Sequence, residues 1–255
     1  MKLSIMTYQI AKDWDLDTYL RVATETGCAG VEFRVELGYK HGVELERTPE
    51  ERQAIRTQCS EAGIDIACVA TGCRFHFPEP EKRAEQVALA KQYVQLASDL
   101  GCGRIRVFGN DLPPDVEKRR VVGFVGNSLR DIAEFAEPLG VDVLLEMHGD
   151  FNDWRTATVA AEWANHQNVA IIYNCDQRDI VEGSVRDCFE GIQHLLRHVH
   201  FHSLLVDYPY KELLSLLKGM DYRGYLSAEL PASDDPQTVM GLTAALMREY
   251  IASVS

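Results

Sequence analysis

Apolar runs and amphipathic stretches alternate along the whole chain. The stretches have apolar residues at helical spacing, as in residues 84–97 and 212–218. Strands that alternate with helices over short links predict a parallel sheet, and eight such units in 255 residues favour a closed (β/α)8 TIM barrel, an α/β fold. The apolar runs, which we expect to form buried strands, lie near residues 2–7, 30–35, 64–70, 104–109, 141–147, 169–174, 198–203 and 224–229.

Residues typical of helix ends stand between these units. Gly27, Gly63, Gly101 and Gly140 each follow a helical stretch and precede an expected strand. Glycine adopts the left-handed backbone of a helix C-terminal cap without strain. The segment Thr48-Pro49-Glu50-Glu51 is typical of a helix start. Both signals therefore support the expected alternation of strands and helices.

The composition narrows the class of protein. Hydrophobic residues make up 46% of the chain and charged residues 25%, which is ordinary for a soluble globular protein. No apolar run reaches the ~18 residues that span a bilayer, and Met1–Met6 lacks the features of a secretion signal. We expect a cytoplasmic protein with no membrane partner and one domain over residues 1–255.

The net charge of −13 argues against a nucleic-acid partner, because proteins that bind the phosphate backbone present basic patches. The most basic stretch, residues 117–120, is short and suits the solvated face of an expected helix. The chain has seven cysteines, an odd number, and none of them forms a CxxC pair. This indicates reduced thiols that pack as small buried residues.

Polar side chains end the four expected strands of the second half. Because the carboxyl ends of parallel strands meet at one face of a barrel, we expect these side chains to converge. Carboxylate and imidazole groups together can hold one divalent cation. The residues are Glu146 and His148 on the fifth strand, Asn174 and Asp176 on the sixth, His200 and His202 on the seventh, and Glu229 on the eighth.

Glu146 and Glu229 are the strongest candidates for metal ligands or acid–base catalysts. A carboxylate at the end of an apolar run is costly to bury unless it is paired or bound to a metal. The alternative is a structural salt bridge, for instance to Arg106. On the sixth strand two interpretations stay open, because Asn174 fits the strand end better and the carboxylate of Asp176 suits a cation better.

Three histidines alternate along the seventh strand and share one face. His200 is best placed for a metal, and His198 is expected near the barrel floor. His202 could be a ligand, a substrate contact or a lid residue.

Charged residues of the first half are candidates for substrate binding. Arg106 could bind a substrate hydroxyl or carboxylate, or it could pair with Glu32 or Glu146. We group Arg106 and Glu32 with His148 and His202 as candidate substrate-binding residues. Aromatic residues in loops, among them Trp14, could line a pocket or cap the barrel.

These motifs resemble the xylose isomerase-like barrel superfamily over nearly the whole chain. Residues 145–148 are similar to its fifth-strand pattern, a Glu with a His two positions later. Residues 198–203 resemble the seventh-strand pattern, in which His200 falls on the metal ligand. Residues 227–230 are similar to the eighth strand, and residues 105–109 resemble the fourth, whose arginine faces the site.

Two positions depart from the family pattern. The sixth strand of the family usually carries Asp, often with His three positions later, whereas Asn174 and Gln177 stand here. The Lys-Asp that usually follows the seventh-strand His is replaced by His202 and Ser203. The first departure bears on metal affinity and the second on the substrate class.

The resemblance implies a metal-dependent isomerase or epimerase of a sugar, keto sugar or related hydroxy-carbonyl compound such as a hydroxy-keto acid. One of the two glutamates would remove a C–H proton, the metal would stabilise the enediolate, and the other glutamate would return a proton. One divalent ion, Mn, Mg, Co or Zn, would be held by Glu146, Asn174 or Asp176, His200 and Glu229.

Other functions on the same barrel stay open. One is a metal-dependent dehydratase or lyase, and another is a sugar-binding barrel that has lost turnover. A phosphodiesterase similar to endonuclease IV is disfavoured, because the first four strands offer few ligands beyond Glu32 and His76 for a three-metal cluster. A homo-oligomer is compatible with the sequence.

Overall fold

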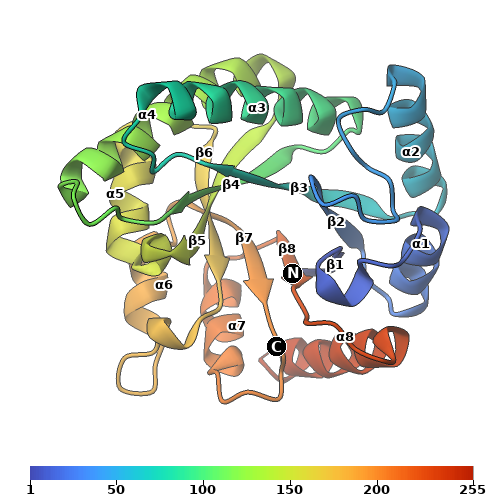
Figure 1. Ribbon diagram of the computed structural model, residues 1–255. Helices are drawn as coiled ribbons and strands as arrows, with labels where there is room; N and C mark the ends of the chain where they lie inside the picture. Colours follow the sequence, from blue (N-terminus) through green and yellow to red (C-terminus); the bar gives the residue numbers. More distant parts are fainter. Residues whose placement is uncertain (255) are drawn as a thin grey trace.

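Each expected strand forms where its apolar run lies. In the computed structural model, which describes residues 1–254, the strands run parallel, pair in chain order and close into a barrel (Figure 1). The predicted fold class is therefore confirmed. The strands are β1 (Lys2–Met6), β2 (Gly30–Arg34), β3 (Asp65–Arg74), β4 (Arg104–Asn110), β5 (Asp142–Gly149), β6 (Val169–Asn174), β7 (Leu196–Phe201) and β8 (Tyr225–Ala228).

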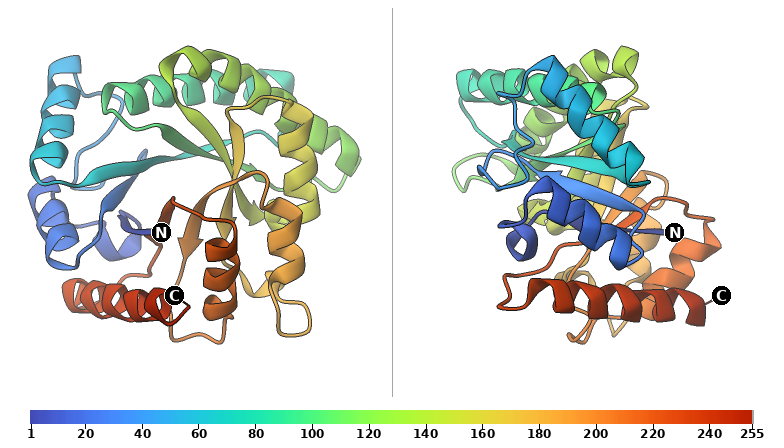
Figure 2. Two further views of the ribbon diagram at one scale, coloured as in Figure 1. Left: turned by 180° about the vertical axis from the view of Figure 1, so that it is seen from behind. Right: turned by 90° about the vertical axis from the view of Figure 1, so that its right-hand side faces the viewer.

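Helices surround the barrel, as the three views in Figures 1 and 2 show. The Thr48 and Glu51 side chains form a reciprocal capping box at the start of the second helix. The four glycines expected to end helical stretches all have positive φ values. The helices are α1 (Leu16–Glu25), α2 (Pro49–Glu61), α3 (Pro80–Asp99), α4 (Lys118–Ala136), α5 (Trp154–Ala164), α6 (Arg186–Ile192), α7 (Tyr210–Gly219) and α8 (Pro236–Ser253), with short 3-10 turns η1 (Gln9–Ala11), η2 (Glu137–Leu139), η3 (Asp150–Asn152) and η4 (Gln177–Asp179).

The two faces of the barrel wall differ in chemistry. The face toward the helices belongs to one large apolar cluster that includes Ile5, Val31 and Phe33. The barrel interior holds a separate small apolar cluster of Leu144, Ala170 and Ile172. The interior also buries charged and polar side chains, among them Glu32, Arg106, Glu146, His198 and His200. Such groups are costly to bury unless they are paired, so the barrel interior is the candidate location of a functional site.

All seven cysteines are buried, and none is in a disulfide among residues 1–254, which agrees with the expected packing of small thiols. None of the helices in this part of the chain is long and apolar enough to cross a membrane.

Candidate active site

His200 stands at the centre of the polar interior. It lies on β7 opposite Asn174 of β6 and Ser227 of β8, and its side chain is fully buried. Its Nε2 atom is 3.0 Å from Glu32 Oε1. Its Nδ1 atom is 3.6 Å from Glu146 Oε1 and 3.8 Å from Glu229 Oε2. Within the described chain this Nδ1 atom has no hydrogen-bond partner.

On the Nδ1 side, His200 belongs to a group that we call the mouth cluster, made of Glu146, Asn174, His200 and Glu229. Arg106 Nη1 donates to Glu146 Oε2 at 2.8 Å. The Asn174 amide donates to the other oxygen, Glu146 Oε1, at 3.1 Å. Glu229 directly follows β8, and its side chain is 12% exposed. The mouth cluster thus places two carboxyls beside one free imidazole nitrogen.

On the Nε2 side, His200 contacts what we call the floor cluster, made of Glu32, His198 and Ser227. Glu32 Oε2 lies 2.8 Å from His198 Nε2, and Ser227 Oγ lies 2.9 Å from the same nitrogen. The two imidazole rings stand nearly perpendicular, with centroids 5.3 Å apart. All these side chains are fully buried, and His198 lies two residues before His200 on β7, toward the amino end of the strand.

The pKa values of Glu32 and Glu146 move in one direction and that of Glu229 in the other. Burial alone would raise the pKa of Glu32, but His200 and His198 outweigh it and hold that pKa well below its ordinary range. The pKa of Glu146 is also lowered, because Arg106 and His200 outweigh the effect of burial. Burial and the neighbouring Glu146 carboxylate instead raise the pKa of Glu229. Adjacent carboxyls whose pKa values move apart are typical of acid–base pairs.

The imidazole pKa values also diverge. Burial lowers the pKa of His198 despite its contact with Glu32. Burial acts the same way on His200, but the carboxylates of Glu32 and Glu146 outweigh it and raise the pKa of His200 well above its ordinary value. The difference reflects the number of acids around each ring.

A cavity of about 480 Å³ opens above the mouth cluster, and we call it the mouth pocket. Its volume lies in the range of small-molecule sites, roughly 300–1,000 Å³. Glu229 and Asn174 reach it, whereas Glu146 and His200 are buried beside it. The lining residues are Tyr8, Gln9, His148, Asn174, Asp176, Arg178, His202, Ser203, Val206, Glu229 and Pro231.

Two histidines that we expected to touch substrate line the mouth pocket. His202 lies one residue beyond β7, where its Nε2 is 2.7 Å from Asn174 Oδ1 and its Nδ1 is 3.0 Å from the Glu229 carbonyl oxygen. His148 Nδ1 lies 3.0 Å from Asn110 Oδ1. Both imidazoles are therefore held by side chains or backbone while they face the cavity.

Three other expected site residues lie elsewhere than at the centre of the pocket. Asp176 pairs with Arg178 at 2.8 Å and caps η4, so Asn174 is the sixth-strand side chain that contacts Glu146. Arg106 is buried and divides its donors between Glu146 and the Thr71 carbonyl oxygen. Glu32 lies in the floor cluster and does not line the mouth pocket.

Some residues that line the mouth pocket were not predicted from the sequence. Tyr8 and Gln9 follow β1, and the strand-end rule applied to the later strands would have found them. Arg178 belongs to η4, and no local pattern signals that its Nη1 reaches the Gly149 carbonyl oxygen. Trp14, by contrast, is buried in the main core and does not line the mouth pocket.

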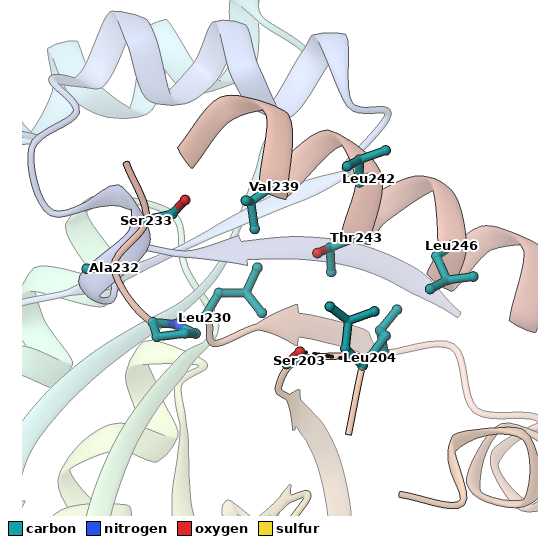
Figure 3. A pocket seen from close by; sticks show the side chains of 11 residues that line it. Ser203, Leu204, Leu230, Ala232, Ser233, Val239, Leu242, Thr243 and Leu246 are labelled. Atoms are coloured by element: carbon teal, nitrogen blue, oxygen red, sulfur yellow. Dashed lines mark hydrogen bonds between the residues drawn. The ribbon is translucent and has the colours of Figure 1, made fainter. Parts of the chain in front are cut away.

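A second hollow of about 370 Å³ lies between α8 and the loops that follow β7 and β8. Figure 3 shows Val239, Leu242 and Leu246 of α8 on one side, with Leu204 and Leu230 opposite. Its lining is almost entirely apolar and contains no titratable side chain. Of these two hollows, the mouth pocket is the one with groups capable of proton transfer or metal binding.

The mouth cluster has a donor set that fits a divalent cation. One oxygen each from Glu146 and Glu229 and one nitrogen of His200 lie within 4.8 Å of one another. Two carboxylates and an imidazole suit Zn²⁺ and related ions. Glu32, His198 and His200 also lie within this limit, but there the Nε2 atoms are at hydrogen-bond distance from the carboxylate. The unpartnered Nδ1 of His200 favours the mouth cluster.

Most of the chain matches a known family model. Residues 20–250 match the family model described as xylose isomerase-like TIM barrel. No curated protein matched the sequence.

Known structures resemble the whole chain. A D-psicose 3-epimerase from Clostridium cellulolyticum H10, crystallised with D-tagatose, has a TM-score of 0.80 and 17% identity, covering 100% of this chain and 99% of that one. An L-ribulose 3-epimerase has a TM-score of 0.84 and 15% identity, with coverage of 99% and 95%. The IOLI protein, described with a binding zinc atom, has a TM-score of 0.82 and 14% identity, with coverage of 100% and 99%. At these identities the likeness shows the fold.

Proposed function

The chain belongs to the xylose isomerase-like TIM barrel family, and from that premise we propose that it is a metal-dependent isomerase or epimerase. Its substrate would be a sugar, keto sugar or related hydroxy-carbonyl compound. The observation that carries the proposal is the pair of carboxyls, Glu146 and Glu229, beside His200 Nδ1 at the base of a sugar-sized pocket. The sugar epimerases among the similar structures support it.

One divalent ion, Mn, Mg, Co or Zn, would be held by Glu146, His200 and Glu229. Asn174, whose amide contacts Glu146, would supply the sixth-strand donor in place of Asp176. When bound, such an ion supplies Lewis-acid stabilisation of the negative charge that develops on a substrate oxygen.

The two glutamates would move the proton. One carboxylate takes a proton from the carbon next to a carbonyl group, and the electron pair of the broken C–H bond moves toward the carbonyl. The other carboxyl returns a proton. Return to the opposite face of the same carbon gives an epimer, and return to the neighbouring carbon gives an isomer.

Surrounding residues would orient the substrate and the carboxyls. His148 and His202 line the mouth pocket and are placed to contact substrate hydroxyls. Arg106 is buried against Glu146 at 2.8 Å, so it would act on the substrate through that carboxylate.

The test is proton exchange into solvent. The protein is incubated with Mn²⁺ in D₂O and a panel of ketoses, keto sugars and hydroxy-keto acids, and the products are analysed by NMR. The proposal expects deuterium at one carbon next to the carbonyl, together with an epimer or isomer. Release of water or a fragment would indicate a dehydratase or lyase instead. Sugar binding without exchange would indicate a barrel that has lost turnover.

A further inference from the structure

Glu32 is a buried carboxyl that the proposed reaction does not use. Its two oxygens contact different imidazoles, Oε1 at 3.0 Å from His200 Nε2 and Oε2 at 2.8 Å from His198 Nε2. No lysine or arginine among residues 1–254 forms an ion pair with it. A fully buried carboxylate is stable only when strong donors satisfy it. These two imidazoles therefore replace the hydrogen bonds that water would otherwise make to Glu32.

The contact determines which nitrogen keeps the proton when the His200 ring is neutral. A carboxylate can only accept hydrogen bonds, so Nε2 of His200 must donate to Glu32. A neutral ring with its proton on Nε2 has a lone pair on Nδ1. That Nδ1 atom faces Glu146 and Glu229 at 3.6 and 3.8 Å and has no hydrogen-bond partner within the described chain.

We propose that Glu32 is a positioning residue that fixes His200 as an Nδ1 ligand for the divalent cation of the mouth cluster. The inference rests on the metal site of the proposed function and gives Glu32 a role away from the substrate. A carboxylate that holds the far nitrogen of a ligating imidazole fixes its tautomer and raises its basicity, and loss of such a partner weakens metal binding about 10–100-fold.

His198 gives the carboxylate a second fixed point. It occupies the Glu32 oxygen that His200 does not use, and Ser227 Oγ lies 2.9 Å from the same His198 nitrogen. Rotation of the Glu32 carboxylate would break both imidazole contacts at once. The floor cluster is therefore a rigid support for one ligand orientation.

A second cation within the floor cluster is the competing explanation. Glu32, His198 and His200 do offer three donor atoms within 4.8 Å of one another. Both Nε2 atoms, however, already lie at hydrogen-bond distance from the carboxylate, and the side chains are fully buried. The inference therefore requires one metal per chain.

The first experiment compares Glu32→Gln with Glu85→Gln by calorimetric titration of the metal-free proteins with Mn²⁺. Glutamine keeps the shape of Glu32 but cannot accept from both imidazoles with both of its polar atoms, because its NH₂ group only donates. We expect one Mn²⁺ per chain throughout, with Kd about 10–100-fold weaker in Glu32→Gln. Glu85→Gln makes the same chemical change at an exposed position of α3, away from both clusters, so its Kd should match the wild type.

The second experiment needs no variant and holds even if Glu32→Gln fails to fold. NMR of the Zn²⁺-loaded wild-type protein with ¹⁵N-labelled histidine should show a proton on His200 Nε2 and metal on Nδ1. A proton on Nδ1, two metals per chain, or a wild-type Kd in a folded Glu32→Gln protein would overturn the inference. Metal binding without substrate exchange would overturn only the proposed function, and a wild-type chain that binds no Mn²⁺ would overturn both.

Discussion

His200 joins two clusters that use the same residue types in different proportions. At the floor cluster, the Glu32 carboxylate lies 2.8 Å from the imidazole of His198 and 3.0 Å from that of His200, so each close contact is a hydrogen bond. In the mouth cluster, two carboxyls approach one imidazole nitrogen at 3.6 and 3.8 Å, too far for good hydrogen bonds. The floor cluster is closed, whereas the mouth cluster adjoins a cavity of about 480 Å³.

Buried polar groups therefore have two different roles in one barrel. One set is satisfied within the fold, and the other can bind a ligand. In the floor cluster, both oxygens of the Glu32 carboxylate lie at hydrogen-bond distance from imidazole nitrogens, so this carboxylate needs no further ligand. A set with excess carboxylate oxygens and one unpartnered nitrogen can be completed by a cation. The difference between the clusters can be tested by removing charges from each.

The largest expected effect is on turnover. Replacing either carboxyl of the mouth cluster, by Glu229→Gln or Glu146→Gln, should lower proton exchange about 10²–10⁴-fold, because one proton-transfer group is lost. The measurement is the rate of deuterium incorporation into the active substrate at saturating Mn²⁺. Glu85→Gln, at an exposed position on α3, is the matched control and should exchange at the wild-type rate. Full exchange in both mouth-cluster variants would refute the proposed mechanism.

The next effect is on stability. Arg106→Met leaves the Glu146 carboxylate buried without its cation and should lower the free energy of unfolding by about 3–5 kcal/mol. Urea unfolding of the metal-free protein measures it. Arg178→Met, which breaks the exposed pair with Asp176, should cost about 1 kcal/mol or less. Equal losses in the two variants would mean that burial does not distinguish these ion pairs.

Asp179 sharpens the contrast with Glu32, because it is a buried carboxyl without an imidazole partner. Burial and nearby Asp176 raise its pKa to about 7, from 3.8. A carboxyl with a raised folded-state pKa stabilises the fold below pH 3.8, and that contribution is lost as pH rises toward 7.

Asp179→Asn should therefore flatten the decline of stability between pH 4 and pH 7. The gain over wild type near pH 8 should be at most about 4 kcal/mol, with little difference at pH 4. Thermal unfolding across this pH range is the measurement. If the decline has the same slope in wild type and variant, the raised pKa of Asp179 is wrong.

The smallest effect distinguishes the two sixth-strand residues. Asn174→Ala removes the amide that contacts Glu146, and we expect Mn²⁺ binding to weaken on the order of tenfold, comparable to a lost hydrogen bond to a charged group, about 1.5 kcal/mol. Asp176→Ala is the matched control, since Asp176 faces Arg178. Calorimetric titration compares them. A larger loss in Asp176→Ala would assign the ligand to that carboxylate.

Local patterns in the sequence predicted much of the architecture. Apolar runs that alternate with amphipathic stretches predicted the eight strands. Residues such as Thr48 and Gly140 predicted where helices begin and end, because these signals depend on neighbours in the chain. The convergence of Glu146, His200 and Glu229 also followed from strand ends alone, since parallel strands share one orientation.

Pairing across the barrel could not be read in the same way. The sequence offered the Arg106–Glu146 salt bridge only as an alternative, which the structure bears out, and it gave no sign of the contact between Glu32 and His198. These pairs are 40 and 166 positions apart, so side-chain direction and strand register decide them. The choice between Asn174 and Asp176 depended on where β6 ends. It ends at Asn174, which leaves Asp176 to cap η4 and face Arg178.

The most direct test of the central claim is a crystal structure of the protein soaked in Zn²⁺, with the metal located by anomalous scattering. The account predicts one strong peak about 2.0–2.2 Å from His200 Nδ1 and from carboxylate oxygens of Glu146 and Glu229. A peak bound by Glu32 and His198 instead, or no peak within the barrel, would contradict it.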